Sequence, residues 1–302
     1  MLLNTIFILI VLVNGTFILQ LLKDLITHKQ ELSKEPGNPI ALAFSQFIIF
    51  FLSTFGISDF AIGASLYPKA KWVEDKKLPG TLNTACVVPV AAMALAYISS
   101  IEVGLATLLI PIIAQVIGAY ISPRYVVKLP KNTIKKFVIV GLLVAAGLIL
   151  AGKLGVYPSG GTETTLSGGK LITLGLLSML YGALNNIGIG SYALTMATIY
   201  AFGLHPGVAF PIMMGACTFS VPVGSLQFIK LDSYSRKITL FSATFGVIGV
   251  LVAAFLVKGL DTNLLQWVVL VVIFYSVYSM VMDLRHDSQK KVAFKQNTEK
   301  YA

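Results

Sequence analysis

The feature that most limits how this sequence can fold is a series of apolar segments, each long enough to cross a lipid bilayer. They cover residues 2–22, 40–67, 79–99, 102–122, 135–156, 170–203, 205–229, 239–258 and 262–284. A helix of about 20 apolar residues crosses a hydrocarbon core of about 30 Å. The loops between the segments are too short to form a soluble domain, and lipid favours helices because they satisfy their own backbone polar groups. The sequence therefore predicts one polytopic, all-α transmembrane domain over residues 1–302.

The positions of the basic residues indicate membrane topology and do not indicate a binding surface for an acidic partner. The net charge is +10, although only 12% of the 302 residues are charged. Lys and Arg fall almost entirely in loops between apolar segments instead of forming one basic face. This distribution is typical of membrane proteins and does not predict a nucleic-acid partner. We expect the chain to be surrounded by membrane lipid.

Two apolar segments are too long for one straight crossing. At a rise of about 1.5 Å per residue, segments 40–67 and 170–203 would reach roughly 42 and 51 Å as helices. Each contains a glycine-rich break, GISDFAIG at 56–63 and GALNNIGIG at 182–190. We therefore expect each long segment to be two shorter helical legs joined at its break.

The two breaks belong to an internal repeat. Ile62-Gly63 matches Ile189-Gly190, and Pro79-Gly80 matches Pro206-Gly207, both at an offset of 127 residues. A break and a Pro-Gly helix start fall in register in both halves, as in transporters built from internal repeats. The repeat unit is one broken segment followed by three spanning segments.

The distribution of Lys and Arg indicates how the repeats are oriented. If every segment crossed once, the two sides of the membrane would carry 13 and 10 basic residues, which is hardly a bias. If each broken segment doubles back as a re-entrant hairpin, the cytoplasmic side carries 20 and the outside 3. The second arrangement obeys the positive-inside rule. It also inverts the second repeat relative to the first, so that the tips of the two hairpins can meet near the bilayer midplane.

The predicted fold is thus two inverted repeats, each a re-entrant helical hairpin plus three spanning helices, preceded by one extra helix. The N-terminus lies outside and the C-terminus in the cytoplasm. The expected parts are an N-terminal helix at 1–26, repeat 1 at 40–156, repeat 2 at 170–284 and a cytoplasmic tail at 285–302.

Asp59 is the acidic residue that lies in the interior of an apolar segment, away from both of its ends. An ionisable group at that depth costs several kcal/mol unless it faces a cavity or a partner, so it is a functional candidate. One interpretation is that its carboxylate caps the outgoing leg of the hairpin, as Asp does at helix starts. The other is that Asp59 couples transport to an ion, either H⁺ or Na⁺.

The two breaks place similar polar residues before their outgoing legs. Ser58-Asp59 corresponds to Asn185-Asn186, so the N-terminus of each outgoing leg points to the midplane with free N–H groups and partial positive charge. Two such ends make an anion site without a buried Lys or Arg. The glycines allow tight turns and close backbone approach, although small residues also serve plain helix packing. The predicted binding residues are Ser58, Asp59, Gly63, Ser65, Asn185, Asn186, Gly190 and Ser191.

Three further residues are candidates to lie near the substrate. Cys86 and Cys217 follow the two Pro-Gly starts on similar helix faces, and Asn83 lies close to Cys86 in sequence. Cysteine can equally act as a small buried hydrophobe, and Asn83 can simply bond a neighbouring helix. The cysteines lack the spacing of a zinc site or disulfide framework, and enzyme motifs such as HExxH and GxSxG are absent. We expect no metal, no cofactor and no enzyme activity.

The duplicated pattern of glycine-rich break, short leg and Pro-containing helix start resembles the sulfite exporter TauE/SafE family. The residues that carry it are GISDFAIGASLYP with LPGTLNTA, and YGALNNIGIGSYALTMATIYAFGLHPGVAFPIMMGACTFSVP. The resemblance spans roughly 40–284 and is more specific in the second repeat. It implies a multi-pass transporter of the bacterial inner membrane. Its substrate would be sulfite, an organosulfonate, or a related sulfur-containing or carboxylate anion.

The sequence thus predicts a secondary transporter that moves a small anion by alternating access around the two hairpin tips. An anion channel, or a non-transporting assembly factor or sensor, is the alternative. The direction of transport, the coupling ion and the oligomeric state stay open at this point.

Overall fold

The computed structural model describes residues 2–55, 58–97, 103–156, 162–205 and 208–256, together with 267, 270, 271, 274, 277, 278, 281, 282, 284 and 285. Every element within these described ranges is helical. The helices are α1 Leu2–Thr27, α2 Lys29–Lys34, α3 Pro39–Ser53, α4 Asp59–Lys69, α5 Leu78–Tyr97, α6 Leu105–Ile121, α7 Pro123–Val126, α8 Lys131–Lys153, α9 Gly168–Asn185, α10 Tyr192–Ala201, α11 Ala209–Lys230, α12 Arg236–Phe241 and α13 Val247–Leu251, with π-helical segments η2 Ser242–Gly246 and η3 Val252–Leu256.

In this described part, six stretches are long and apolar enough to cross a membrane. They are Thr5–Thr27, Leu78–Ala96, Leu105–Val126, Asn132–Lys153, Pro211–Lys230 and Arg236–Phe255. The all-helical transmembrane fold class is therefore confirmed. The helix expected after the second Pro-Gly start lies at α11, but Pro206-Gly207 itself and most of the segment 262–284 and the tail lie outside the described residues.

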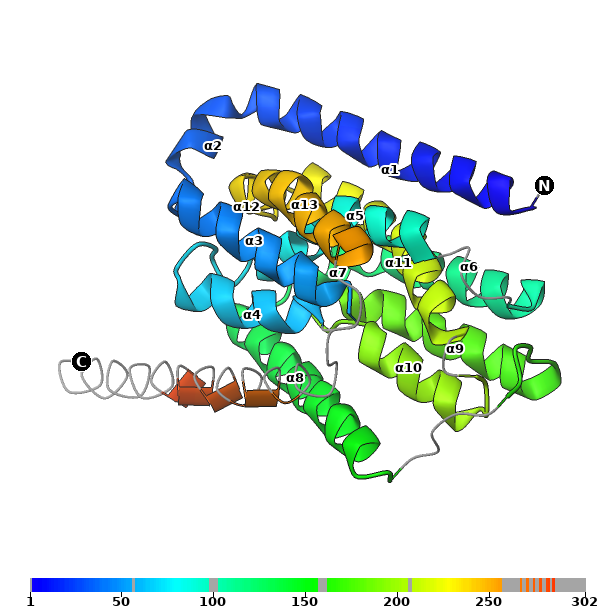
Figure 1. The fold of residues 1–302 in the computed structure, drawn as a ribbon. Helices are drawn as coiled ribbons and strands as arrows, with labels where there is room; N and C mark the ends of the chain where they lie inside the picture. The colour runs from blue at the N-terminus through cyan, green and yellow to red at the C-terminus, as the bar shows by residue number, and fades with distance from the viewer. Residues whose placement is uncertain are drawn as a thin grey trace.

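Both long apolar segments are broken where the sequence predicts. The first is α3 followed by α4, with the chain leaving helix after Ser53 and re-entering it at Asp59. Asn38 caps α3 through its side-chain oxygen, and Pro39 occupies the first turn, where a missing N–H costs nothing. The two legs contact each other (Figure 1). The Tyr67 hydroxyl on α4 joins them by donating to Gln46 Oε1 on α3 at 2.9 Å.

The second break separates α9 from α10 and has the same kind of tie. The Tyr181 hydroxyl on α9 and the Thr198 hydroxyl on α10 are 2.7 Å apart. Gly188, inside the break, has φ +99°, a conformation that glycine adopts without strain. Each break is therefore a turn between two short legs that one buried tyrosine hydroxyl holds together.

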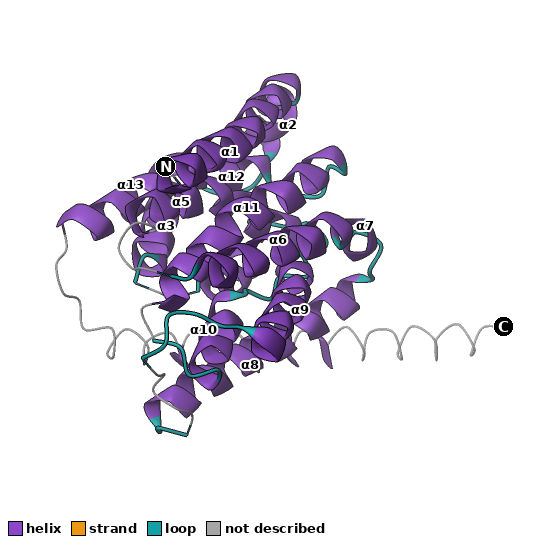
Figure 2. Cartoon of the chain, turned by 90° about the vertical axis from the view of Figure 1, so that its right-hand side faces the viewer, coloured by secondary structure: helices purple, strands orange, loops and turns teal. Residues whose placement is uncertain are grey.

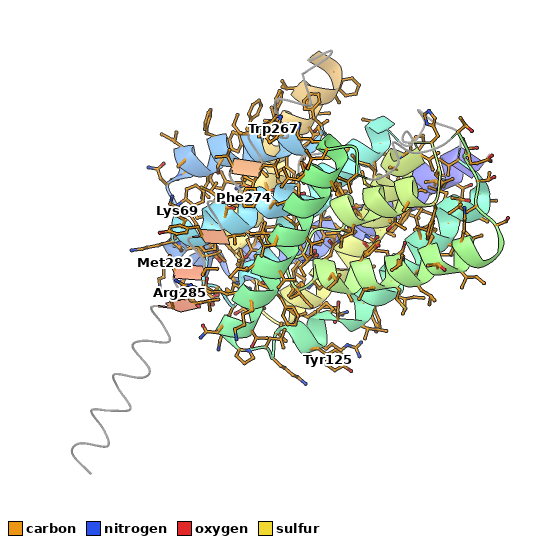
Figure 3. The ribbon with its side chains drawn as sticks, turned by 90° about the horizontal axis from the view of Figure 1, so that it is seen from below. Lys69, Tyr125, Trp267, Phe274, Met282 and Arg285 are labelled. Carbon is orange, nitrogen blue, oxygen red and sulfur yellow. The ribbon has the colours of Figure 1, made fainter. Side chains whose placement is uncertain are left out.

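The centre of the molecule is made by α5, α6, α9 and α11, of which α5 and α11 are the most deeply buried spans. Glycine lets α6 and α9 approach closely, because a Cβ on Gly118 would meet the Met179 carbonyl and one on Gly182 would meet the Gln115 carbonyl. Figure 2 shows α1 across one side of this bundle and α8 with α10 on the opposite side. The described residues Trp267, Phe274, Met282 and Arg285 run in sequence order along the side that carries α8 (Figure 3). These four residues lie outside the central four helices.

The extra N-terminal helix is anchored by a buried charge cluster, here called the Arg236 cluster. Arg236, only 1% exposed, donates from Nε to Asp24 Oδ2 at 2.8 Å and forms ion pairs with Glu31 and Asp232. The Tyr234 hydroxyl donates to the same Asp24 oxygen at 2.5 Å, and burial raises the pKa of Tyr234, so it remains a neutral donor. Since α1 extends past the apolar stretch 2–22 to Thr27, it carries Asp24 into this cluster. The cluster fixes α1 and α2 to the start of α12.

Candidate functional site

The two breaks meet at one small pocket that is partly open to its surroundings. Residues from α4, α5, α9, α10 and α11 surround it. They are Ser58, Asp59, Phe60, Cys86, Val90, Asn185, Gly190, Ser191, Tyr192, Cys217 and Val221. Residues from both halves of the sequence therefore build a single site, as the repeat predicts.

The first break contributes the N-terminus of α4. Ser58 is the N-cap residue, and its hydroxyl oxygen accepts from the Ala61 N–H at 3.3 Å. Asp59 is the first helical residue and is 7% exposed. Its carboxyl group faces the backbone N–H groups of Asp59 and Phe60, with the Ser53 hydroxyl of α3 beside it. Ser58 thus takes the capping role that the sequence allowed for Asp59, and the Asp59 carboxyl lies at the positive end of α4.

The second break contributes the N-terminus of α10 and touches the first directly. A Cβ on Gly190 would lie 3.0 Å from Ser58 Oγ and 3.2 Å from Phe60 Cβ. These separations are tighter than ordinary Cβ contacts, so glycine at position 190 favours the close approach of the two breaks. Because α4 and α10 both begin at the cavity wall, the positive ends of two helices flank the same space.

A chain of hydrogen bonds fixes the second break. The Asn83 amide on α5 donates to the Asn185 carbonyl at 2.9 Å. The Asn185 amide donates to Ser191 Oγ at 3.3 Å, and Ser191 Oγ lies 3.3 Å from Cys217 Sγ. Gln115 on α6 donates to that sulfur at 3.4 Å. The cavity wall on this side is a rigid network of neutral groups.

Two members of this network, Asn83 and Asn185, keep an unused acceptor, and of these Asn185 lines the pocket. Asn185 is 2% exposed, and its Oδ1 atom has no hydrogen-bond partner in the structure. A buried acceptor without a partner costs about 1–3 kcal/mol, and at this pocket a ligand that carries a donor could pair with it.

Asp59 supplies the charged group of the cavity. In the part of the chain that the structure describes, the lining contains no Lys, Arg or His. Those described residues also contain no cluster of three His, Cys, Asp or Glu side chains that could hold a metal ion. The positive potential of the site therefore comes from helix ends, and its negative charge from one carboxylate.

Seven of the residues that the sequence singled out line the cavity. They are Ser58, Asp59, Asn185, Gly190, Ser191, Cys86 and Cys217. Four others do not line it, for reasons visible in their contacts.

Gly63 packs against the side chains of Leu82 and Tyr67, so it serves helix packing. Ser65 donates back to the Ala61 carbonyl at 2.8 Å within its own helix.

Asn186 turns away from the cavity, and its amide donates to the Ala119 carbonyl at 2.8 Å and to Ser122 Oγ at 2.7 Å. Asn83 stands behind the lining: its amide donates to the Asn185 carbonyl, and its own carbonyl accepts from Cys86 Sγ at 3.3 Å. Gly56 lies outside the described residues.

Four lining residues escaped the sequence reasoning, namely Phe60, Val90, Tyr192 and Val221. Three are ordinary hydrophobic residues in membrane helices, which carry no signal that distinguishes a cavity wall from a lipid face. Tyr192 follows Ser191 at the start of α10, and its position beside a predicted helix start was the available signal.

The family model of the sulfite exporter TauE/SafE family matches residues 171–301. The resemblance that the motifs indicated is thereby confirmed for the second half of the chain. The matched range contains the second break and the cavity residues of α9, α10 and α11, and it begins after the first repeat ends. No curated protein and no solved structure matches the chain.

Proposed function

We propose that this protein is a secondary transporter of a small anion, namely sulfite, an organosulfonate, or a related sulfur-containing or carboxylate anion. The family match over 171–301 and the six apolar spans support a multi-pass membrane transporter of anions. The observation that carries the proposal is that α4 and α10 both begin at one pocket built from the two breaks. Helix N-termini attract anions through free N–H groups and partial positive charge.

The arrangement of the two hairpins supports our proposal of alternating access. In Figure 1, α2, which leads into α3, lies at the left of the molecule, whereas the chain enters α9 from the right. Hairpins that open to opposite sides, with their tips in contact, support two inverted repeats around a central site. At about 1.5 Å per residue, the 11 residues of α4 and the 10 of α10 reach only about half of a bilayer. Rocking of one repeat against the other would open the cavity to each side in turn.

Asp59 is the residue that we propose to couple transport to an ion gradient. It is a buried carboxyl at the cavity wall, where its charge state alters the electrostatics of the bound anion. Ser58, Asn185 and Ser191 would hold the anion together with the backbone at the two helix starts. Cys86 and Cys217 would contact its remaining surface.

Anion binding is tested by thermal unfolding of the purified protein with sulfite, thiosulfate, methanesulfonate or acetate. A ligand at 100 times its Kd stabilises the folded state by about 2.7 kcal/mol, so a specific anion should raise the unfolding temperature in a saturable manner. An assembly factor or sensor without this site would show no anion-dependent shift.

Transport is tested in proteoliposomes with the anion that gives the largest shift. The wild-type protein should show saturable uptake that depends on pH, and Asp59→Asn should abolish that dependence. Glu74→Gln is the matched control, because it also removes one carboxyl group but lies exposed in the loop before α5. Flux that does not saturate would favour a channel, and unchanged pH dependence in Asp59→Asn would remove this residue from coupling.

A further inference from the structure

We propose that the Asp59 carboxylate occupies the anion site of the empty transporter, and that one proton binds to Asp59 for each monovalent anion that replaces it. This inference rests on the proposed function, and it names the coupling ion, the stoichiometry and the direction of coupling at the same site. The proton and the anion would cross the membrane together.

The first argument is that the carboxylate and the substrate need the same donors. The Asp59 carboxyl group faces the N–H groups of Asp59 and Phe60 at the start of α4. These belong to the unpaired N–H groups of the first helical turn, which would bind a substrate anion at this helix end. An ionised Asp59 is therefore a tethered anion that satisfies them when the substrate is absent.

The second argument is the charge balance of the cavity. Four other titratable side chains interact electrostatically with Asp59, and each is neutral when protonated. They are Tyr67 on α4, Cys86 on α5, Tyr192 on α10 and Cys217 on α11. No cationic side chain lines the cavity in the described part of the chain. Two negative charges in one small, buried site repel strongly, and the two helix ends together supply only about one positive charge. The site therefore accommodates the anion or the carboxylate, but not both.

The third argument is the unused acceptor of Asn185. Its Oδ1 atom lacks a partner, although the side chain is almost fully buried and lines the same cavity. An ionised Asp59 is also an acceptor, so it cannot supply the hydrogen that the Asn185 oxygen lacks. A proton on Asp59 converts one of the two acceptors into a donor. This observation is independent of the helix ends and favours uptake of a proton when the site is loaded.

The same geometry favours H⁺ over Na⁺. A metal cation bound at Asp59 would lie against the positive ends of α4 and α10, which repel it. A proton neutralises the carboxylate and frees the N–H groups for the substrate. It comes from the water on the loading side, binds to a carboxylate oxygen and returns to water on the other side when the anion leaves.

The test counts the protons taken up on binding. Methanesulfonate is titrated calorimetrically into the purified full-length protein in buffers that differ in ionisation enthalpy, because the slope of heat against that enthalpy gives protons bound per anion. Methanesulfonate remains ionised throughout, so the protons bind to the protein. We expect about one proton per anion where Asp59 is ionised in the empty state. We also expect about a tenfold weaker Kd for each unit by which pH rises in that range.

Two variants and one control test whether the proton binds to Asp59 or to another group. Asp59→Asn should bind methanesulfonate with no linked proton and with a pH-independent Kd, whereas Asp59→Glu should keep proton uptake. Glu74→Gln should match the wild-type protein. Binding without proton uptake at any pH, or a Kd that requires Na⁺, would overturn this inference and leave the anion site intact. If methanesulfonate, sulfite and acetate all fail to bind to the wild-type protein, the proposed function falls and the inference falls with it.

Discussion

The two breaks of this molecule have the same architecture but differ in how they treat polar groups. The first ends in an ionisable side chain, Asp59, whose partners are mostly backbone N–H groups. The second holds Asn185 and Ser191 in a network of neutral side chains that reaches α5, α6 and α11. One break therefore supplies a charge that can change, and the other supplies a wall that stays fixed. In a coupled carrier, one of two similar elements can thus supply the titratable group while the other supplies a fixed binding surface.

The largest expected effect comes from separating the two breaks. Gly190→Val places methyl groups where even a Cβ would be 3.0 Å from Ser58 Oγ, so the tips must move apart and the cavity must fill. We expect anion uptake in proteoliposomes to fall at least about tenfold, since a displacement of about 1 Å at a reacting or binding centre has effects of this size. The control is Gly147→Val on α8, where an added Cβ would meet nothing within 4 Å. Equal uptake by both variants would show that the tips need not touch.

Removal of an anchor from the second break should mainly affect stability. Asn186→Ala leaves the Ala119 carbonyl and the Ser122 hydroxyl without their donor, and we expect a loss of about 1–3 kcal/mol in the free energy of unfolding. Uptake per folded molecule should change little, because Asn186 does not line the cavity. Unfolding in denaturant and uptake normalised to folded protein measure the two quantities. A stable variant that loses anion binding would reverse the assignment of roles within the second break.

Loss of the cap at the first break should have a smaller effect. Ser58→Ala removes the acceptor of the Ala61 N–H and should cost about 1 kcal/mol of stability. Ser58→Gly should cost less, since glycine is tolerated at N-cap positions. Thermal unfolding of both variants in detergent compares them. If Ser58→Ala proves neutral, the first break does not depend on its cap.

The smallest expected effect is a difference between two hydroxyl deletions. Tyr67→Phe leaves Gln46 Oε1 without its donor in a fully buried position, whereas Tyr181→Phe leaves Thr198, which can still donate to the Leu194 carbonyl. Both should destabilise the protein, and Tyr67→Phe by up to about 1 kcal/mol more. Parallel unfolding curves measure the difference. A larger loss in Tyr181→Phe would mean that the second hairpin is the more weakly held of the two.

The fold class and the breaks followed from the sequence because they depend on length and on strong local signals. Segment 40–67 is too long for a single crossing, and glycine with Ser58 ends one helix and starts the next. The sequence repeat pairs the two breaks, although neither segment alone shows that they belong together. In the structure both breaks line one cavity, through Ser58 and Asp59 from the first and Asn185, Gly190 and Ser191 from the second.

The sequence pattern did not predict which side chains around each break point into the cavity. Asn185 and Asn186 are chemically identical neighbours, yet one lines the cavity and the other binds to the end of α6. Which of them points inward depends on the rotation of α9 against α6, and that rotation is set by close glycine contacts such as that of Gly182 with the Gln115 carbonyl. Such contacts depend on tertiary packing and not on local sequence.

The Arg236 cluster has a consequence for how this protein is made. Asp24 and Arg236 are 212 positions apart in the chain, so α1 is synthesised long before the arginine that neutralises its buried carboxylate. Until α12 is inserted, Asp24 lies near the membrane surface without that partner, and an unpaired charge there is costly to bury. A chain that stops before Arg236 lacks the contacts that fix α1 and α2 to α12. The final docking of α1 is coupled to completion of the second repeat.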